Sequence, residues 1–164
     1  GASAHLVLKM VRRRFPGVRV YAFARNEAER RFALDLGAVW AGDAEDVCPE
    51  PLDSVIDTTP AWKPVLEALR CLRPGGRLVI NAIRKEAGDL QSLLQLDYPQ
   101  HLWMEKEIKS VANVTRRDVQ EFLELAATVP LKPEFQEYAL ADANRALREL
   151  KERKIRGAKV LRMN

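Results

Sequence analysis

Apolar residues recur along the chain with two spacings that take turns, one typical of helices and the other typical of strands. Helical spacing appears first at 3–15, where a Pro-Gly pair ends it. The stretch 18–24 then alternates apolar and polar residues and is rich in strand-forming types. Asn26, with Glu29 three residues later, predicts a capped helix that ends at Gly37.

The same succession of helices and strands continues to the end of the chain. Pro64 suits the first turn of a helix, where its missing N–H is not needed. Thr115 and Asp118 predict the start of a helix over 117–129. The remaining pattern predicts strands at 38–42, 53–59, 77–83, 107–114 and 158–164, and helices at 64–72, 90–96 and 142–154.

Strands that are joined by helices form a mostly parallel sheet with helices on both faces. With right-handed crossovers, this order of elements predicts an α/β fold with a doubly wound, Rossmann-type sheet. In such a sheet a central strand precedes the first helix, and the sequence shows no strand before 3–15. We therefore expect a sheet that lacks its first central strand, with a visible interruption unless other material fills the place.

The first residues fit part of a phosphate-binding turn. Gly1 and Ala4 match the second half of a G-x-G-x-x-G/A fingerprint. A glycine in this turn lets backbone N–H groups approach a pyrophosphate at the positive end of a helix. Gly1 suits that approach, and the small side chain of Ala4 suits packing of the helix against the sheet. The alternative is a glycine of no special role.

The end of the strand at 18–24 is where a nucleotide-binding fold selects its coenzyme. NAD-binding proteins place an acidic residue there, which accepts hydrogen bonds from the adenosine ribose. This chain has Ala24 and Arg25 instead. The small side chain of Ala24 leaves room at this position, while Arg25 can pair with a 2′-phosphate and stack on adenine. The sequence therefore favours NADP(H) over NAD(H), and the alternative is a solvated loop arginine.

The strands at 53–59 and 77–83 should end at the same crevice, because parallel strands direct their carboxyl ends to one edge of a sheet. Thr58, Thr59 and Asn81 lie at these ends. They suit either a place beside a nicotinamide ring or helix caps and turns, and the sequence does not separate these roles.

Catalytic and metal-binding patterns are absent from the sequence. Its two histidines, His5 and His101, are far apart and suit packing or the surface. Cys71 lies between leucines on a predicted helix and is expected to pack as a small hydrophobic residue, and Cys48 is expected to be inert. We therefore predict no catalytic residue and no metal site.

Composition narrows the class of protein. The chain has 164 residues, of which 47% are hydrophobic and 30% charged, as in an ordinary soluble domain. The net charge of +4 is spread over helix faces without the aromatic residues that stack on bases, so no nucleic acid partner is expected. There is no membrane-length apolar run, no signal-peptide pattern and no disulfide framework, so the expected location is the cytoplasm.

Four segments together resemble the medium-chain, zinc-containing alcohol dehydrogenase family, and specifically its coenzyme-binding domain. The resemblance covers essentially the whole chain, in order. The closing RGAKVL and the GA after the helix that begins at Asn26 are particularly characteristic. The segments are FARNEAERRFALDLGA, VIDTTPAWKPVLEALRCLRPGGRLVI, EKEIKSVANVTRRDVQEFLELAA and ALADANRALRELKERKIRGAKVL.

The resemblance implies an NAD(P)-dependent oxidoreductase acting on an alcohol or aldehyde, with zinc in a catalytic domain that the chain lacks. It implies a dinucleotide-binding domain at 1–157 and a terminal strand at 158–164 that returns to the catalytic domain. A homodimer formed through the strand at 107–114 is also implied. The coenzyme-binding positions would be Gly1, Ala4, Ala24, Arg25, Thr58 and Asn81. This chain alone is expected to be inactive.

Two other functions remain open from the sequence. One is an S-adenosylmethionine-dependent methyltransferase, since its sheets also contain L-x-P-G-G turns. Such enzymes usually carry an acidic residue where Ala24 and Arg25 stand here. The other is a module without catalytic activity that senses a redox coenzyme.

Overall fold

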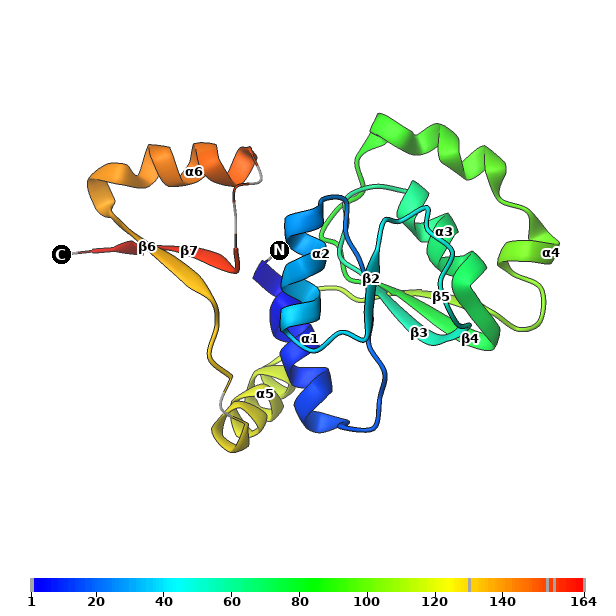
Figure 1. The fold of residues 1–164 in the computed structure, drawn as a ribbon, viewed down its shortest axis with the longest axis horizontal. Coiled ribbons are helices and arrows are strands. Elements are labelled where there is room, and N and C mark those ends of the chain that lie inside the picture. The colour runs from blue at the N-terminus through cyan, green and yellow to red at the C-terminus, as the bar shows by residue number, and fades with distance from the viewer. Residues whose placement is uncertain (1, 130, 153, 155, 164) are drawn as a thin grey trace. The chain divides into compact units, whose positions relative to one another are not determined.

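The computed structural model describes residues 2–129, 131–152, 154 and 156–163. The chain divides into two compact units, one formed by residues 1–41 with 120–164 and the other by residues 42–119 (Figure 1). No helix in the described ranges is both long enough and apolar enough to cross a membrane.

The first unit begins with a helix, a strand, a second helix and a second strand. β1 pairs with β2, and the rings of Phe23 and Trp40 pack in a T-shaped arrangement with centroids 5.2 Å apart. Asn26 caps α2, because its side-chain oxygen accepts a hydrogen bond from the Glu29 N–H at 2.8 Å. This confirms the cap that the sequence predicts. The elements are α1 (Ala2–Arg14), β1 (Tyr21–Phe23), α2 (Glu27–Asp35) and β2 (Trp40–Gly42).

The C-terminal part of the first unit is a strand–helix–strand motif. β6 and β7 are parallel, with register pairs from Phe135↔Ala158 to Ala139↔Arg162. The sequence analysis did not predict β6, and with it β7 has a partner inside the chain. The elements are α5 (Arg116–Thr128), which begins in the second unit, then β6 (Phe135–Ala139), the 3₁₀ helix η2 (Leu140–Asp142), α6 (Ala143–Lys151) and β7 (Ala158–Arg162).

A polar cluster holds this motif together. The Lys159 ammonium donates to the Glu149 carboxylate at 2.6 Å and to the Tyr138 hydroxyl oxygen at 2.5 Å. The Tyr138 hydroxyl also donates to Glu149 at 2.5 Å. One residue comes from each of β6, α6 and β7, so the cluster fixes the helix over the strand pair.

The second unit is a three-stranded parallel sheet in the order β3-β4-β5, with α3 connecting β3 to β4. α3 is helical where the sequence predicts it, with Pro64 in its first turn. Its apolar side faces the sheet and forms the core with β4. The core residues are Val65, Leu66, Leu69, Leu72 and Leu78. The elements are β3 (Leu52–Asp57), α3 (Lys63–Cys71), β4 (Leu72–Ile80), the 3₁₀ helix η1 (Ala87–Gln95), α4 (Tyr98–His101) and β5 (Glu107–Ser110).

The strands do not join into one sheet. β1 pairs with β2, while β3 belongs to the separate sheet with β4 and β5. Within the described residues no strand pairing connects these two sheets. The fold is thus mixed α/β with parallel strands, and the missing first central strand stays a prediction.

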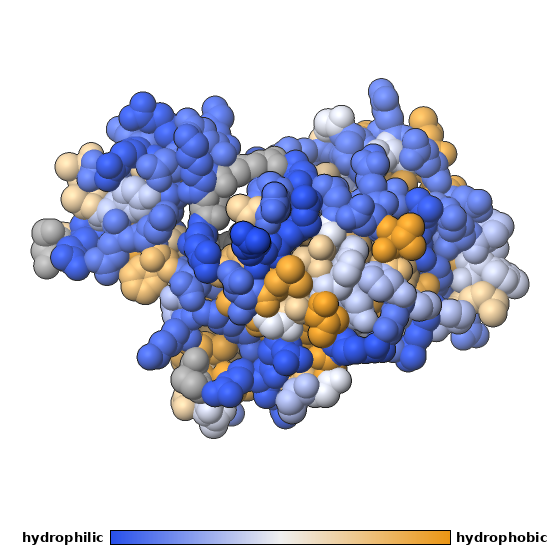
Figure 2. Space-filling model, viewed as in Figure 1, coloured by the Kyte–Doolittle hydropathy of each residue, from blue (hydrophilic) through white to orange (hydrophobic). Residues whose placement is uncertain are grey.

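Several boundaries differ from the sequence prediction. β5 ends at Ser110 rather than at residue 114, and Asn113 has a φ of 57°, which is not compatible with a strand. The short helix predicted at 90–96 is the 3₁₀ helix η1, which begins earlier, at Ala87, and ends at Gln95. The face shown in Figure 2 is mostly hydrophilic, with scattered hydrophobic residues.

Candidate functional site

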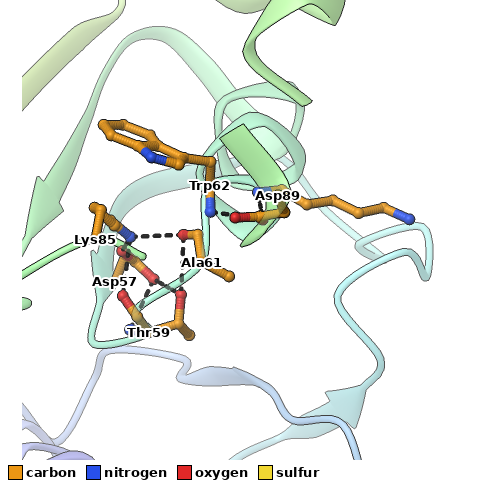
Figure 3. Close-up of polar contacts among 7 residues, drawn as sticks. Asp57, Thr59, Ala61, Trp62, Lys85 and Asp89 are labelled. Carbon is orange, nitrogen blue, oxygen red and sulfur yellow. Dashed lines mark hydrogen bonds and ion pairs between the residues drawn. The ribbon is translucent and has the colours of Figure 1, made fainter. Parts of the chain in front are cut away.

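The carboxyl ends of β3 and β4 carry a buried ion pair. Asp57 is the last residue of β3, and Lys85 lies in the loop after β4. The Lys85 ammonium donates to the Asp57 carboxylate, to the Thr59 carbonyl at 2.9 Å and to the Ala61 carbonyl at 2.8 Å (Figure 3). The two charged side chains are only 10% and 4% exposed. The pair therefore joins the loops that follow two neighbouring strands.

The second carboxylate oxygen of Asp57 is also hydrogen-bonded. The Thr59 hydroxyl donates to it at 2.8 Å and the Thr59 N–H at 3.1 Å. The backbone carbonyl of Asp57 accepts from the Asn81 N–H at 2.7 Å. Because buried charges are tolerated only when paired and hydrogen-bonded, this set of contacts fixes the backbone on both sides of Thr58.

The start of α3 is fixed from the same loop region. Trp62 is the N-cap residue but makes no side-chain cap bond. The Asp89 carboxylate instead accepts from the Trp62 N–H at 2.7 Å and from the Lys63 N–H at 2.8 Å (Figure 3). An acidic group at this end is stabilised by the free N–H groups and by the helix dipole.

Thr58 and Asn81 are exposed, between residues that are held in place. The structure thus brings the two predicted positions to the same edge of the sheet, as their place at the ends of β3 and β4 requires. Lys85 and Asp89 were not identified from the sequence. The only available signal was Asp57, a carboxylate at the end of an apolar strand, which needs a cation once it is buried.

The predicted coenzyme-selecting position lies in the first unit, directly after β1. Ala24 is half-buried and Arg25 is exposed. No ion pair joins the Arg25 side chain to another residue in the described ranges. Arg30 of α2 donates to the carbonyls of both residues, at 2.9 Å and 3.2 Å. This arginine was also missed by sequence reasoning.

The predicted phosphate turn is described only in part. Gly1 lies outside the described residues. Ala4 lies in the first turn of α1 and its side chain is exposed. Its role in helix packing stays a prediction.

The histidines and cysteines are placed as follows. His5 and His101 are each 3% exposed. The His101 Nδ1 accepts from the Asp97 N–H at 2.9 Å, so this histidine has a structural partner.

Cys71 is half-buried and lies beside Cys48, and burial raises the pKa of the Cys71 thiol. Among the residues that the structure describes, no group of three metal-ligating side chains could hold a metal ion.

A family comparison decides the class of protein. The family described as zinc-binding dehydrogenase matches residues 5–128. The chain belongs to this family. Among its relatives is a protein of Mycobacterium tuberculosis described as a probable alcohol dehydrogenase AdhA, which is 38% identical over 161 residues, or 98% of this chain. The match spans 44% of that relative, so the chain corresponds to less than half of it.

Several solved structures share the fold of this chain. One is a cinnamyl alcohol dehydrogenase of Sorghum bicolor, with a TM-score of 0.81 and 20% identity. The superposition covers 96% of this chain and 44% of the sorghum chain. Another is a CAD from Helicobacter pylori, complexed with NADP(H), with a TM-score of 0.70 and 21% identity. The superposition covers 90% of this chain and 42% of the Helicobacter chain. These likenesses show a Rossmann-type dehydrogenase fold.

Proposed function

We propose that the chain is the NADP(H)-binding domain of a zinc-dependent alcohol dehydrogenase or aldehyde reductase. The observation that carries this proposal is the match of residues 5–128 to the zinc-binding dehydrogenases. The ion pair and hydrogen bonds that fix the strand ends around Asp57 support it, because open α/β folds bind their ligands at the carboxyl ends of the strands. An arginine in place of an acid after β1 supports NADP(H) over NAD(H).

The chain's own residues would hold the coenzyme, with separate roles in each unit. Arg25 would pair with the 2′-phosphate beside Ala24, and Gly1 and Ala4 would belong to the turn that holds the pyrophosphate. Thr58 and Asn81 would lie beside the nicotinamide. The bound coenzyme would supply hydride transfer to or from an alcohol or aldehyde substrate.

The described residues do not fit a zinc site, because they offer no cluster of ligands. We therefore assign no step through zinc to this chain. Proton transfer and the polarisation of the substrate oxygen would belong to the part of the relatives that the chain does not span. This chain alone would bind coenzyme and turn over no alcohol.

The domain boundaries and the dimer are part of the same proposal. Residues 1–157 would form the dinucleotide-binding domain, and 158–164 would return to the catalytic domain. β5 supports a dimer, since all four of its residues are exposed and it pairs only with β4 in the described sheet. An unpaired strand edge of this kind accepts a strand from a second copy.

Calorimetric titration of the 164-residue chain tests the coenzyme proposal. NADPH should bind more tightly than NADH, and S-adenosylmethionine should not bind. Arg25→Asp should remove the preference for NADPH. The control is Arg31→Asp, an exposed arginine of α2 that changes the charge equally. Tightest binding of S-adenosylmethionine would instead support a methyltransferase, and binding of none of the three would overturn the proposal.

Sedimentation equilibrium tests the dimer. The wild-type chain should sediment as a dimer, and Ile108→Lys should shift it towards the monomer. Ile108 lies in β5 and is 46% exposed, so the change places a charge at the proposed edge without disturbing a core. A monomeric wild type, or a dimer that this variant leaves unchanged, argues against pairing through β5.

A further inference from the structure

Arg30 folds back from α2 onto the loop that follows β1. A single guanidinium nitrogen of Arg30 donates to the Ala24 carbonyl at 2.9 Å and to the Arg25 carbonyl at 3.2 Å. The bond to Ala24 is partly buried. These contacts tie two successive peptide groups of the loop to the first turns of the helix.

The two hydrogen bonds fix more than the carbonyl groups. Each peptide group is planar, and the described part of the chain contains no cis peptide bond. A carbonyl that is turned towards Arg30 therefore turns the N–H of the next residue away from it. The N–H groups of Arg25 and Asn26 consequently point to the side of the loop opposite Arg30.

The other end of the loop is held as well. Asn26 caps α2 through its bond from the Glu29 N–H, and its carbonyl accepts from the Arg30 N–H at 3.1 Å. The loop residues at 24–26 are thus fixed by α2 from both sides. The Arg25 side chain is exposed and remains able to meet a ligand.

Charge near the loop also matters for an anionic ligand. The first turn of α2 contains Glu27 and Glu29, which suit the helix start but repel a phosphate. The guanidinium of Arg30 lies against the loop carbonyls and adds a positive charge close to Arg25. It therefore reduces the repulsion from the two glutamates at this point.

We propose that Arg30 is a positioning residue for coenzyme selection, which orients the loop so that the Arg25 side chain and the outward N–H groups meet the 2′-phosphate of NADP(H). This inference rests on the proposed function. It assigns to Arg30 a part in selectivity and none in the chemistry of hydride transfer.

The test measures calorimetric dissociation constants of the 164-residue chain for adenosine 2′,5′-bisphosphate, adenosine 5′-monophosphate, NADPH and NADH. Arg30→Ala should weaken binding of the two 2′-phosphorylated ligands about tenfold, because the displaced loop would lose the charge-assisted contact of Arg25 with the 2′-phosphate, and should change the other two less than about twofold. Arg30→Lys keeps the charge but cannot hold both carbonyls in the same way, so its loss should be intermediate. Arg31→Ala is the matched control and should leave the selectivity unchanged.

The outcomes separate the inference from the proposed function. An equal loss for all four ligands in Arg30→Ala would make Arg30 merely structural and overturn the inference alone. Wild-type selectivity in Arg30→Lys would show that charge suffices, which also overturns it. Equal losses in Arg31→Ala and Arg30→Ala would do the same. A folded wild type that binds none of the ligands overturns the proposed function and the inference together. If Arg30→Ala fails to fold, as judged by circular dichroism, the selectivity of Arg30→Lys decides.

Discussion

Lys85 and Asp57 join the loops after β4 and β3 through an ion pair that is almost completely buried. Removing two charges from water is unfavourable, and here the remaining donors and acceptors are satisfied by Thr59 and by the Ala61 carbonyl. Within the described residues no buried side-chain nitrogen or oxygen lacks a partner. The pair therefore sets the backbone geometry of this edge of the sheet.

Lys85→Met should destabilise the chain by about 3 kcal/mol, because it leaves the Asp57 carboxylate buried without its cation. Urea unfolding followed by circular dichroism measures this change. The double variant Asp57→Asn with Lys85→Met should be more stable than Lys85→Met alone, since it removes both charges.

A matched control for this prediction is Lys63→Met. Lys63 forms an ion pair with Glu45, but its side chain is 45% exposed and that of Glu45 is 67% exposed. Such pairs contribute about 0–1 kcal/mol, so this variant should unfold almost as the wild type does. If the two lysine substitutions lowered the free energy of unfolding equally, burial of the Lys85 ion pair would not explain the destabilisation.

Gly157→Ala should be strongly destabilising, by roughly 2–4 kcal/mol. Gly157 has a φ of 74°, and a Cβ there would lie 1.9 Å from the carbonyl oxygen of Glu134. The close approach allows the Ala158 N–H to donate to the same carbonyl at 2.8 Å. Thermal unfolding with near-ultraviolet circular dichroism would follow the loss.

Gly75→Ala separates the clash from the backbone conformation. Gly75 has a φ of 70°, yet a Cβ there would meet nothing within 4 Å. Its substitution should therefore cost only the left-handed conformation, about 1 kcal/mol. If Gly157→Ala cost no more than Gly75→Ala, the contact with Glu134 would not limit position 157.

Cys71 should be alkylated slowly at neutral pH. Burial raises the pKa of its thiol above the ordinary 9.0, and the neighbouring Cys48 thiol raises it further. The reactive thiolate is therefore scarce below pH 9 and increases as the pH rises. Iodoacetamide labelling from pH 7 to pH 10, followed by peptide mass spectrometry, gives the rate at each cysteine. Native Cys71 that reacts as fast as in the urea-unfolded chain would contradict this expectation.

Stability should fall at acidic pH through Glu149. Hydrogen bonds from Lys159 and Tyr138 lower the pKa of Glu149 below its ordinary 4.5. A carboxylate whose pKa is lower in the folded state stabilises the fold above pH 4.5, and this stabilisation is lost as the pH falls through the lowered value. Tyr138→Phe removes one of the bonds, so a carbon-13 NMR titration should find the Glu149 pKa closer to 4.5 than in the wild type. An unchanged titration would exclude the hydroxyl as a cause.

The helices and strands that carry strong local signals could be predicted from the sequence. The cap of α2 by Asn26 and the amphipathic α3 are local patterns, and both are confirmed. β6 could not be predicted in the same way, because it is exposed and gains its stability from pairing with β7 over a distance in sequence. The early end of β5 at Ser110 and the left-handed backbone of Asn113 could not be predicted either, because the alternation of residue types continues through this segment.

In the candidate site, too, positions set by local sequence signals could be predicted, and contacts between distant residues could not. Thr58, Asn81 and Arg25 follow strands, so their place at strand ends could be predicted from the order of elements. The residues that hold them in place could not. Lys85 reaches Asp57 across 28 positions in sequence, and Arg30 acts through backbone carbonyls that are not encoded by side-chain type. Contacts of these kinds become visible only in three dimensions.

The capping of α3 by Asp89 has a consequence for the order in which the chain acquires its structure. Asp89 lies 27 positions after Trp62, and its carboxylate accepts a hydrogen bond from the Trp62 N–H, so this helix start depends on a loop closure and not on a neighbouring residue. During synthesis, β4 and the segment after it must emerge before the cap can form. The first turn of α3 is therefore completed only after residue 89 has left the ribosome.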